Sequence, residues 1–298
     1  MFPARFNYSR ADTLDEAVAM LQRLGPEAKA IAGGQTLLPL LKLRLLQPSH
    51  VVDIGRVEAA RGIQVSEDEI AIGASMTHAM NARADATRTL SIVRDCASGI
   101  ADEQVRSMGT IGGSLAEADP SGCWPTLLVA LDATVRCVGP KGRRGQSVRR
   151  LLQDAYSPNL DDFELIESVH IQRVALAGHG AFVAFKRAAA AYPTASVALQ
   201  VNFSGGRVCG VAMSLGCVGP TPLFVDGAAA ALRDSPLDAD AVLKLQDLAE
   251  STANPTSDNK GSADYKRSLI RGLVRRACGV VEARRNGIQP TNTHTYYG

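Results

Sequence analysis

Two short segments with paired glycines carry the clearest chemical signal in this sequence. They read AIAGGQT at residues 30–36 and TIGGS at residues 110–114. Glycine lets a backbone approach a ligand closely, and N–H groups that point inward from such a bend suit phosphate oxygens. The hydroxyls of Thr36 and Ser114 and the amide of Gln35 add further hydrogen-bond donors. Two such segments in one chain predict an extended ligand whose diphosphate lies between two loops.

Each segment also has a purely structural explanation. A bend that needs a positive φ accounts for a single Gly-Gly pair about as well as ligand binding does. Neither segment matches the phosphate loop G-x-x-x-x-G-K-S/T or the nicotinamide fingerprint G-x-G-x-x-G. Asp119, which precedes Pro120, can accept hydrogen bonds from sugar hydroxyls or can cap the next turn. The residues alone leave both explanations open.

The first glycine segment belongs to a unit in which strands and helices alternate. Thr13 and Glu16 form a capping box before an apolar stripe, which predicts a helix ending at Gly25-Pro26. The unit continues with a short buried strand at 29–32, the glycine bend, a helix at 37–46 and a strand at 51–54.

The second glycine segment follows a predicted hairpin and a predicted helix. Residues 63–65 and 70–72 flank an acidic turn, which is typical of a hairpin. A helix is expected at about 90–100, and a strand at 134–138. The basic, glycine-rich stretch 139–144 is best explained as a solvated hairpin loop.

The pattern changes at about residue 175. Strands at 182–185, 196–203 and 207–218 predict a meander, in which Ser204-Gly205-Gly206 makes the last turn. Two helices follow, at 237–251 and from Ser262 towards Arg285. We expect a loose tail from about Gln289.

Composition argues against several classes of partner. The 298 residues are 46% hydrophobic and carry a net charge of +2, so nothing indicates a nucleic acid or an anionic membrane surface. The longest apolar runs, such as Leu37–Leu41, are too short to span a bilayer. The N-terminus lacks the apolar core of a secretory signal, and we therefore expect a cytoplasmic protein.

Cysteine and histidine usage argues against a metal site in this chain. None of the 6 cysteines forms a C-x-x-C pair, and the 5 histidines are scattered without the spacing of metal ligands. In a cytoplasmic protein the cysteines are expected to be reduced. Redox chemistry would then require an organic cofactor.

Three stretches together resemble a known family: AIAGGQTLLPLLKLRL, QVRSMGTIGGSLAEADPSGCWP and SADYKRSL. They are similar to the FAD-binding medium subunit of molybdenum hydroxylases, the three-subunit relatives of xanthine dehydrogenase and carbon monoxide dehydrogenase. The resemblance covers essentially the whole chain, and its motifs are specific in this order and spacing.

The fold that this resemblance implies is α+β. It has a two-lobed FAD-binding domain of the vanillyl-alcohol-oxidase (PCMH) type, followed by a smaller C-terminal domain with a three-stranded sheet and helices. We place the FAD-binding domain at 1–175, with lobes of about 1–57 and 58–175. The carbon monoxide dehydrogenase flavoprotein type C-terminal domain is placed at 176–298.

The resemblance also implies a set of FAD contacts. The first glycine segment would wrap the diphosphate, and the second would approach the diphosphate and the ribityl chain. Asp119 would bond the ribityl or flavin end, Lys186 would approach the isoalloxazine, and Tyr192 would stack on it. Without the resemblance, Lys186 reads as a surface lysine and Tyr192 as a core or loop aromatic. The implied cofactor-binding residues are Ala32, Gly33, Gly34, Gln35, Thr36, Thr110, Ile111, Gly112, Gly113, Ser114, Asp119, Lys186 and Tyr192.

Some residues depart from the family pattern. Thr36 replaces the more usual Ser, Ser114 stands where Asn is common, and Glu117 stands where His is common. Glu117 adds negative charge near a diphosphate unless it points away. The cysteine-rich insertion that some relatives carry for an extra iron–sulfur cluster is not present, so FAD alone is expected in this chain.

By resemblance, the chain is one subunit of an oxidoreductase. It would receive electrons from the [2Fe-2S] clusters of a small subunit and pass them through FAD to an acceptor such as NAD or oxygen. A large subunit would hold the molybdenum cofactor and hydroxylate the substrate, in a dimer of heterotrimers. This chain would then need no catalytic residue and no metal ligand of its own.

Two alternatives remain open from the sequence. One is a self-contained flavin reductase of the same fold, such as a UDP-N-acetylenolpyruvoylglucosamine reductase, which would need its own substrate pocket and a proton donor. The other is a flavin-free scaffold subunit, against which the intact pairs Gly33-Gly34 and Gly112-Gly113 argue.

Overall fold

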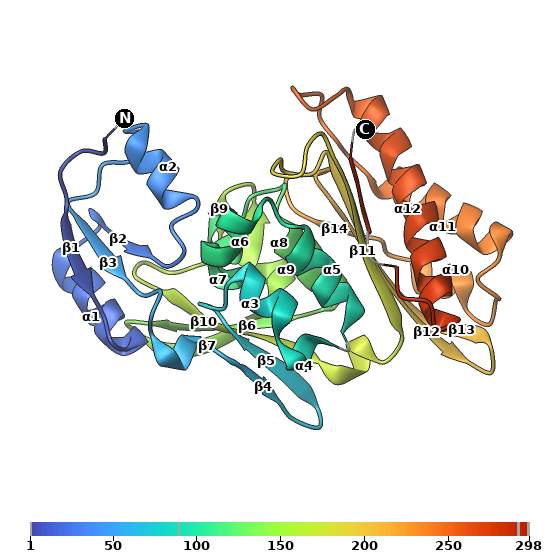
Figure 1. Ribbon diagram of the computed structural model, residues 1–298, viewed down its shortest axis with the longest axis horizontal. Coiled ribbons are helices and arrows are strands. Elements are labelled where there is room, and N and C mark those ends of the chain that lie inside the picture. The colour runs from blue at the N-terminus through green and yellow to red at the C-terminus, as the bar shows by residue number, and fades with distance from the viewer. Residues whose placement is uncertain (1, 89, 291–292, 297–298) are drawn as a thin grey trace.

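A computed structural model describes residues 2–88, 90–290 and 293–296. Figure 1 shows three parts in sequence order: a small lobe at the N-terminus, a central lobe rich in short helices, and a C-terminal part built on a long sheet. Within the described ranges, no helix combines the length and apolarity needed to cross a membrane.

The first lobe is a parallel sheet with helices on its connections. Its strand order is β1-β3-β2, formed by Asn7–Arg10, His50–Asp53 and Ala28–Ile31. Helix α1 (Leu14–Leu24) packs against β2 and β3. The predicted Thr13 cap is confirmed, because the Glu16 N–H donates to Thr13 Oγ1 at 3.1 Å. The reciprocal bond differs from a capping box, since the Glu16 carboxylate accepts from the N–H of Asp12 at 2.8 Å and not from that of Thr13. Strand β1 is the element of this lobe that the sequence patterns did not predict.

Helix α2 (Leu37–Lys42) is shorter than the predicted 37–46. The chain leaves the helix at Arg44, which has a φ of 56°. The Arg44 N–H donates to Leu41 O at 3.1 Å and the Leu45 N–H donates to Leu40 O at 3.0 Å, a Schellman motif that satisfies the last carbonyls. The apolar spacing continues past this point, but Leu43 and Leu45 are exposed, so no core contact extends the helix.

The central lobe contains a five-stranded antiparallel sheet in the order β4-β5-β10-β6-β7. The predicted hairpin is confirmed as β4 and β5, and the basic stretch forms the tip of the β6–β7 hairpin, with β7 beginning at Gly142. Arg143 on β7 binds Asp15 of the first lobe at 2.8 Å, which ties the two lobes together. The strands are Ile63–Val65, Glu69–Gly73, Leu165–Gln172, Thr134–Gly139 and Gly142–Ser147.

Short helices cover one face of this sheet. The predicted helix at about 90–100 is confirmed as α5. Trp124 of α8 is fully buried in the core that these helices share with the sheet. The other elements of the central lobe are η1 (Glu58–Ala60), α3 (His78–Arg83), α4 (Asp85–Arg88), α5 (Ser91–Gly99), α6 (Glu103–Met108), α7 (Ile111–Glu117), α8 (Cys123–Ala130), α9 (Val148–Leu151), β8 (Leu152–Asp154), β9 (Ser157–Pro158) and η2 (Arg173–Leu176).

The C-terminal part is an antiparallel meander held between two helical layers. Helices α5 and α8 of the central lobe contact one side of its sheet, and α11 and α12 lie on the other side (Figure 1). The predicted three strands are confirmed as β11, β12 and β13, and two short strands, β14 and β15, extend the sheet to five. These elements are β11 (His179–Lys186), β12 (Ala195–Ser204), β13 (Arg207–Gly216), β14 (Leu223–Phe224), α10 (Ala228–Leu232), α11 (Ala239–Thr252), α12 (Ala263–Arg285) and β15 (His294–Tyr296).

Two contacts join α12 and the tail to the rest of the molecule. Arg284, near the end of α12, forms a buried ion pair with Asp95 of α5 at 2.7 Å. The expectation of a loose tail is wrong for residues 294–296, because β15 pairs in parallel with β11. His294 is buried there against Gly99 and Phe182. The three-residue sequence of β15 is too short to predict these contacts.

Candidate functional site

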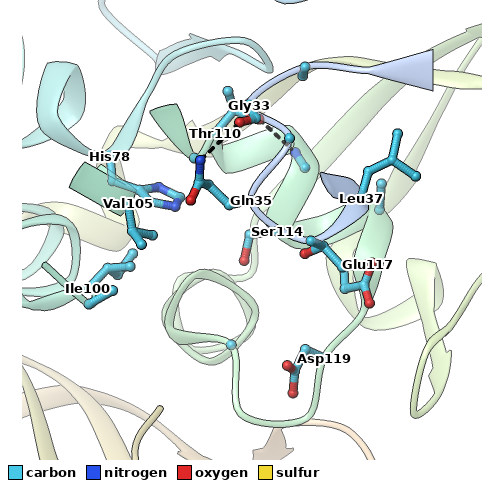
Figure 2. Close-up of a pocket in the computed structure, with 18 of the residues that line it drawn as sticks. Gly33, Gln35, Leu37, His78, Ile100, Val105, Thr110, Ser114, Glu117 and Asp119 are labelled. Atoms are coloured by element: carbon cyan, nitrogen blue, oxygen red, sulfur yellow. Dashed lines mark hydrogen bonds between the residues drawn. The ribbon is translucent and has the colours of Figure 1, made fainter. Parts of the chain in front are cut away.

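A cavity of about 520 Å³ lies where the three parts of the molecule meet. Its volume falls within the range of small-molecule and cofactor sites, about 300–1,000 Å³. Figure 2 shows side chains from the first glycine segment, the second glycine segment and α3 around it. The wall is formed by residues 29–37, Leu40 and Leu46 of the first lobe, by His78, Ile100, Ala101, Val105, Gly109, Thr110, Gly113, Ser114, Ala116, Glu117, Asp119, Gly122 and Cys123 of the central lobe, and by Lys186 and residues 190–193.

The first glycine segment presents free backbone donors to this cavity. Gly34 has a φ of 70°, which turns the chain between β2 and α2. Among the described residues, the N–H groups of residues 33–37 donate to no protein acceptor. The carboxamide of Gln35 donates back to Gly33 O at 3.2 Å and steadies the bend (Figure 2). A run of unpaired N–H groups in a concave wall is suited to anionic oxygens.

Gly33 is required by a close approach between the two lobes. A Cβ atom at this position would overlap the carbonyl oxygen of Met108 and would lie 2.8 Å from Gly109 Cα. The bend of the first lobe therefore rests directly on the loop that leads into the second glycine segment. This contact is made by backbone atoms, so a neighbouring side chain cannot move away to relieve it.

The second glycine segment is the start of helix α7, and this corrects the expectation of a second open turn. Thr110 caps the helix by accepting from the Gly113 N–H at 3.0 Å. The Ile111 N–H donates to Met76 O at 3.1 Å and the Gly112 N–H donates to Ala74 O at 2.9 Å. These three N–H groups are therefore already paired within the protein. The signal for a helix was present, because Thr110 stands at the cap position, but two glycines in the first turn obscured it.

The two glycines of this segment have different roles. A Cβ on Gly112 would lie 2.6 Å from the Cβ of Ala74, so this glycine allows α7 to pack against the end of β5. A Cβ on Gly113 would meet only the Thr110 hydroxyl, at 2.9 Å. Gly113 and Ser114 line the cavity, whereas Ile111 and Gly112 are buried behind its wall.

Two carboxylates lie beyond α7 on the same wall (Figure 2). Asp119 accepts from the Ser121 N–H at 2.8 Å, so it caps the following turn while it also lines the cavity. Glu117 lines the cavity as well. Burial, and secondly the charge of Asp119, raise the pKa of Glu117.

Lys186 is a buried cation in the cavity wall, and its interpretation as a surface lysine is wrong. Its Nζ donates to the carbonyl oxygens of Gly99 and, at 3.4 Å, of Ala189. Among the described residues its hydrogen-bond partners are these two carbonyl groups, and it forms no ion pair with a carboxylate. Burial lowers the pKa of Lys186. A buried ammonium without a counter-charge favours a ligand that carries or develops negative charge.

Tyr192 lies at the rim of the cavity and is 55% exposed. Its ring centre is 5.7 Å from Lys260 Nζ, which also donates to Ser121 Oγ at 2.9 Å and to Pro193 O at 3.2 Å. Lys260 thus links the loop that carries Tyr192 to the turn after Asp119. The interpretation of Tyr192 as a core residue is wrong, and a loop aromatic at the rim is what the structure shows.

His78 is a cavity residue that the sequence patterns did not identify. It is only 6% exposed, and its Nδ1 accepts a hydrogen bond from Trp124 Nε1 at 3.0 Å. Burial, followed by the charge of Arg106, lowers the pKa of His78 to about 4. Its hydrogen-bond partner, Trp124, is 46 positions away in the sequence, so no local motif indicates that His78 belongs to the site.

Of the sequence-predicted residues, those that line the cavity are Ala32, Gly33, Gly34, Gln35, Thr36, Thr110, Gly113, Ser114, Asp119, Lys186 and Tyr192. Cys123 lines it too, but burial raises the pKa of its thiol to about 11, which keeps the sulfur protonated and unreactive. In the chain as described, no group of three or more His, Cys, Asp or Glu side chains could hold a metal ion.

Comparison with protein families gives two matches that together span most of the chain. Residues 4–172 match the family described as "FAD binding domain in molybdopterin dehydrogenase". Residues 180–281 match the family described as "CO dehydrogenase flavoprotein C-terminal domain".

Individual relatives agree with these matches. The chain is 36% identical over 286 residues to the carbon monoxide dehydrogenase medium chain of Afipia carboxidovorans, covering 95% of this chain and 99% of that protein. It is 31% identical over 278 residues to the nicotine 6-hydroxylase medium subunit of Paenarthrobacter nicotinovorans, covering 93% of this chain and 96% of that protein.

Solved structures show the same similarity in three dimensions. A chain of carbon monoxide dehydrogenase from Hydrogenophaga pseudoflava superimposes with a TM-score of 0.91 at 35% identity, covering 95% of this chain and 99% of that one. A chain of quinoline 2-oxidoreductase from Pseudomonas putida 86 gives a TM-score of 0.89 at 30% identity, covering 94% and 98%.

Proposed function

The chain belongs to the family of FAD-binding medium subunits of molybdenum hydroxylases, and from this we propose that its interlobe cavity holds FAD for electron transfer. The observation that carries the proposal is the run of unpaired N–H groups at residues 33–37 in a cavity shared by both lobes. FAD, when bound, supplies the redox chemistry, and the protein binds and orients it.

The residues present fit this cofactor. Free N–H groups and the absence of a side chain at Gly33 and Gly34 provide a cradle for a diphosphate. The hydroxyl of Ser114 and the carboxylate of Asp119 lie on the opposite wall, where they can bond oxygens and hydroxyls of the ribityl chain. Glu117 is a second carboxylate on this wall, and burial together with the charge of Asp119 raises its pKa.

We assign Lys186 and Tyr192 to the flavin end. Lys186 places a positive charge in the cavity wall and has no carboxylate partner among the described residues. This charge would stabilise the negative charge of reduced FAD. Tyr192, held by the Lys260 contacts, would cover one face of the ring and limit the access of water. Ile111 and Gly112 would support the site from behind its wall.

The assembly around this subunit is part of the proposal. We place a large subunit with the molybdenum cofactor and a small subunit with [2Fe-2S] clusters beside it, as a dimer of heterotrimers in the cytoplasm. The final acceptor would be NAD or oxygen. Within this chain, residues 1–175 would form the FAD-binding domain, with lobes of about 1–57 and 58–175, and residues 176–298 the C-terminal domain.

Neither alternative function is favoured. The relatives are medium or FAD-binding subunits of multi-subunit enzymes, which does not favour a self-contained flavin reductase. The open donors at residues 33–37 would have no purpose in a flavin-free scaffold.

The native complex provides the test. The chain should be purified with its bound partners from its natural source, and the flavin, molybdenum and iron content should be measured per chain. We expect about one FAD per chain together with molybdenum and the iron of two [2Fe-2S] clusters. A chain that purifies alone, and that takes up no flavin when it is refolded with FAD, would contradict the proposal.

A further inference from the structure

The ring of His78 presents a polar atom, Nε2, in the wall of the cavity. Among the described residues, no hydrogen bond is formed by Nε2 of His78, although this side chain is only 6% exposed. The ring lines the cavity, and Figure 2 shows it pointing towards Gln35 and Thr110. Nε2 is open to the cavity rather than enclosed by protein, so the group that it bonds is expected to be whatever fills the cavity.

Trp124, which bonds the other nitrogen of the His78 ring, determines whether Nε2 donates or accepts a hydrogen bond. An indole N–H can only donate, and Trp124 Nε1 donates to His78 Nδ1 at 3.0 Å. Nδ1 must therefore be unprotonated, and the neutral ring carries its proton on Nε2. The lowered pKa of about 4 keeps the ring in this neutral form near pH 7. The cavity thus contains a fixed N–H donor that requires an acceptor.

The backbone around His78 keeps this donor accessible. The His78 N–H donates to Gly109 O at 2.9 Å, and Thr77 bridges Thr110, so the start of α3 is joined to the second glycine segment. A Cβ on Gly109 would lie 2.6 Å from Nε2. Glycine at position 109 therefore leaves the donor unobstructed at the point where both glycine segments face the cavity.

We propose that His78 Nε2–H donates a hydrogen bond to a diphosphate or ribityl oxygen of FAD, and that Trp124 is a positioning residue that holds the required tautomer. This inference rests on the proposed function. An oxygen is the expected acceptor because the neighbouring groups, the Gln35 amide and the Thr110–Ser114 segment, are themselves assigned to that part of the cofactor. No other described side chain competes for Nε2.

Two substitutions of His78 distinguish the effect of its N–H donor from the effect of its ring. We expect His78→Phe to weaken FAD binding by about tenfold or more, as for the loss of one buried hydrogen bond. His78→Gln, which keeps an N–H donor, should stay within about threefold of the wild type. His170→Phe is the matched control, because His170 is equally buried but bonds Ser168 and Glu69 away from the cavity. The dissociation constant would be measured by flavin fluorescence on the full chain, with the melting temperature of each apoprotein.

Nitrogen-15 NMR of the 5 histidines tests the same inference without a substitution. The apoprotein should show His78 as the neutral Nε2–H tautomer, and its Nε2 signal should shift when FAD is added. Trp124→Phe should produce a mixture of tautomers and weaker FAD binding. Wild-type protein that binds FAD with an unchanged Nε2 signal, or His78→Phe protein that folds and binds FAD normally, would overturn this inference alone. Wild-type protein that binds no FAD would overturn it together with the proposed function.

Discussion

The bend at Gly33 rests on the carbonyl group of Met108, with no room for a side chain between them. Gly33 belongs to the first lobe and Met108 to the end of α6 in the central lobe, so this contact sets the distance between the two walls of the cavity. The position of one glycine therefore controls both the packing of the lobes and the width of the site.

The first prediction concerns this contact. Gly33→Ala would force the two backbones apart, and we expect FAD binding to weaken by at least about 100-fold, since misplacement by even 1 Å is costly at a binding site. Gly279→Ala, at a helical position with no atom within 4 Å of the added Cβ, is the control and should keep normal FAD binding. Isothermal titration of both apoproteins with FAD provides the measurement. Equal affinities in the two variants would show that the contact does not set the site.

The second prediction separates the two glycines of α7. Gly112→Ala introduces a Cβ that would lie 2.6 Å from Ala74 Cβ, and we expect a loss of about 1–3 kcal/mol in the free energy of unfolding from overpacking. Gly113→Ala meets only the Thr110 hydroxyl and faces the cavity, so it should leave stability within about 1 kcal/mol but reduce FAD affinity. Urea unfolding of the apoproteins and FAD titration would separate the effects. If both variants lost the same property, the different roles assigned to these glycines would be incorrect.

The third prediction concerns the charge of Lys186. Lys186→Met removes a buried ammonium, and reduced FAD would lose a stabilising charge, so the midpoint potential of bound FAD should fall by about 30 mV or more. Lys29→Met, which removes an exposed lysine from the rim of the same cavity, should have a smaller effect because water screens its charge. Spectroelectrochemical titration measures both potentials. A potential unchanged by Lys186→Met would place the flavin ring away from this residue.

The fourth prediction is the pH dependence of stability. Burial is the main cause that lowers the pKa of His78 to about 4 and that of His294 to about 3, whereas both titrate near 6.5 in the unfolded chain. Their stabilising contribution is complete above pH ~6.5 and is lost as the pH falls towards the folded-state values, because only the unfolded chain then binds the protons. Each histidine should cost about 1.4 kcal/mol per pH unit below pH ~6.

Urea unfolding of the apoprotein between about pH 7 and about pH 5 measures this slope. His294→Gln should remove roughly half of it, since one of the two rings with a lowered pKa is then absent. A slope that is the same in this variant and in the wild type would show that other groups cause the loss.

The sequence predicted the elements that local patterns define. The helix cap at Thr13, the bend at Gly33-Gly34 and the long final helix each depend on residues close together in the chain, and each is confirmed. The family resemblance then identified residues such as Lys186, for which local patterns indicate only a surface lysine. Its position in the cavity wall comes from β11, a strand of the C-terminal part.

Tertiary contacts account for what the sequence did not reveal. The second glycine segment is helical because Gly112 packs on Ala74, and that contact outweighs the low helix propensity of glycine. Strand β15 pairs with the edge of β11 that β12 leaves open. The three residues of β15 alone do not indicate this pairing. His78 was not predicted as a site residue because the side chain that it bonds, Trp124, is distant in the sequence.

The hydrogen bond between Trp124 and His78 also provides an optical signal. Trp124 is the single tryptophan among the 298 residues, and it is fully buried one hydrogen bond away from the cavity wall. The tryptophan emission of the chain, excited selectively over its 6 tyrosines, therefore arises from one known position beside the proposed cofactor. Occupation of the cavity by a flavin, which absorbs where tryptophan emits, would quench that emission, so the loading of the subunit can be followed in solution without any added label.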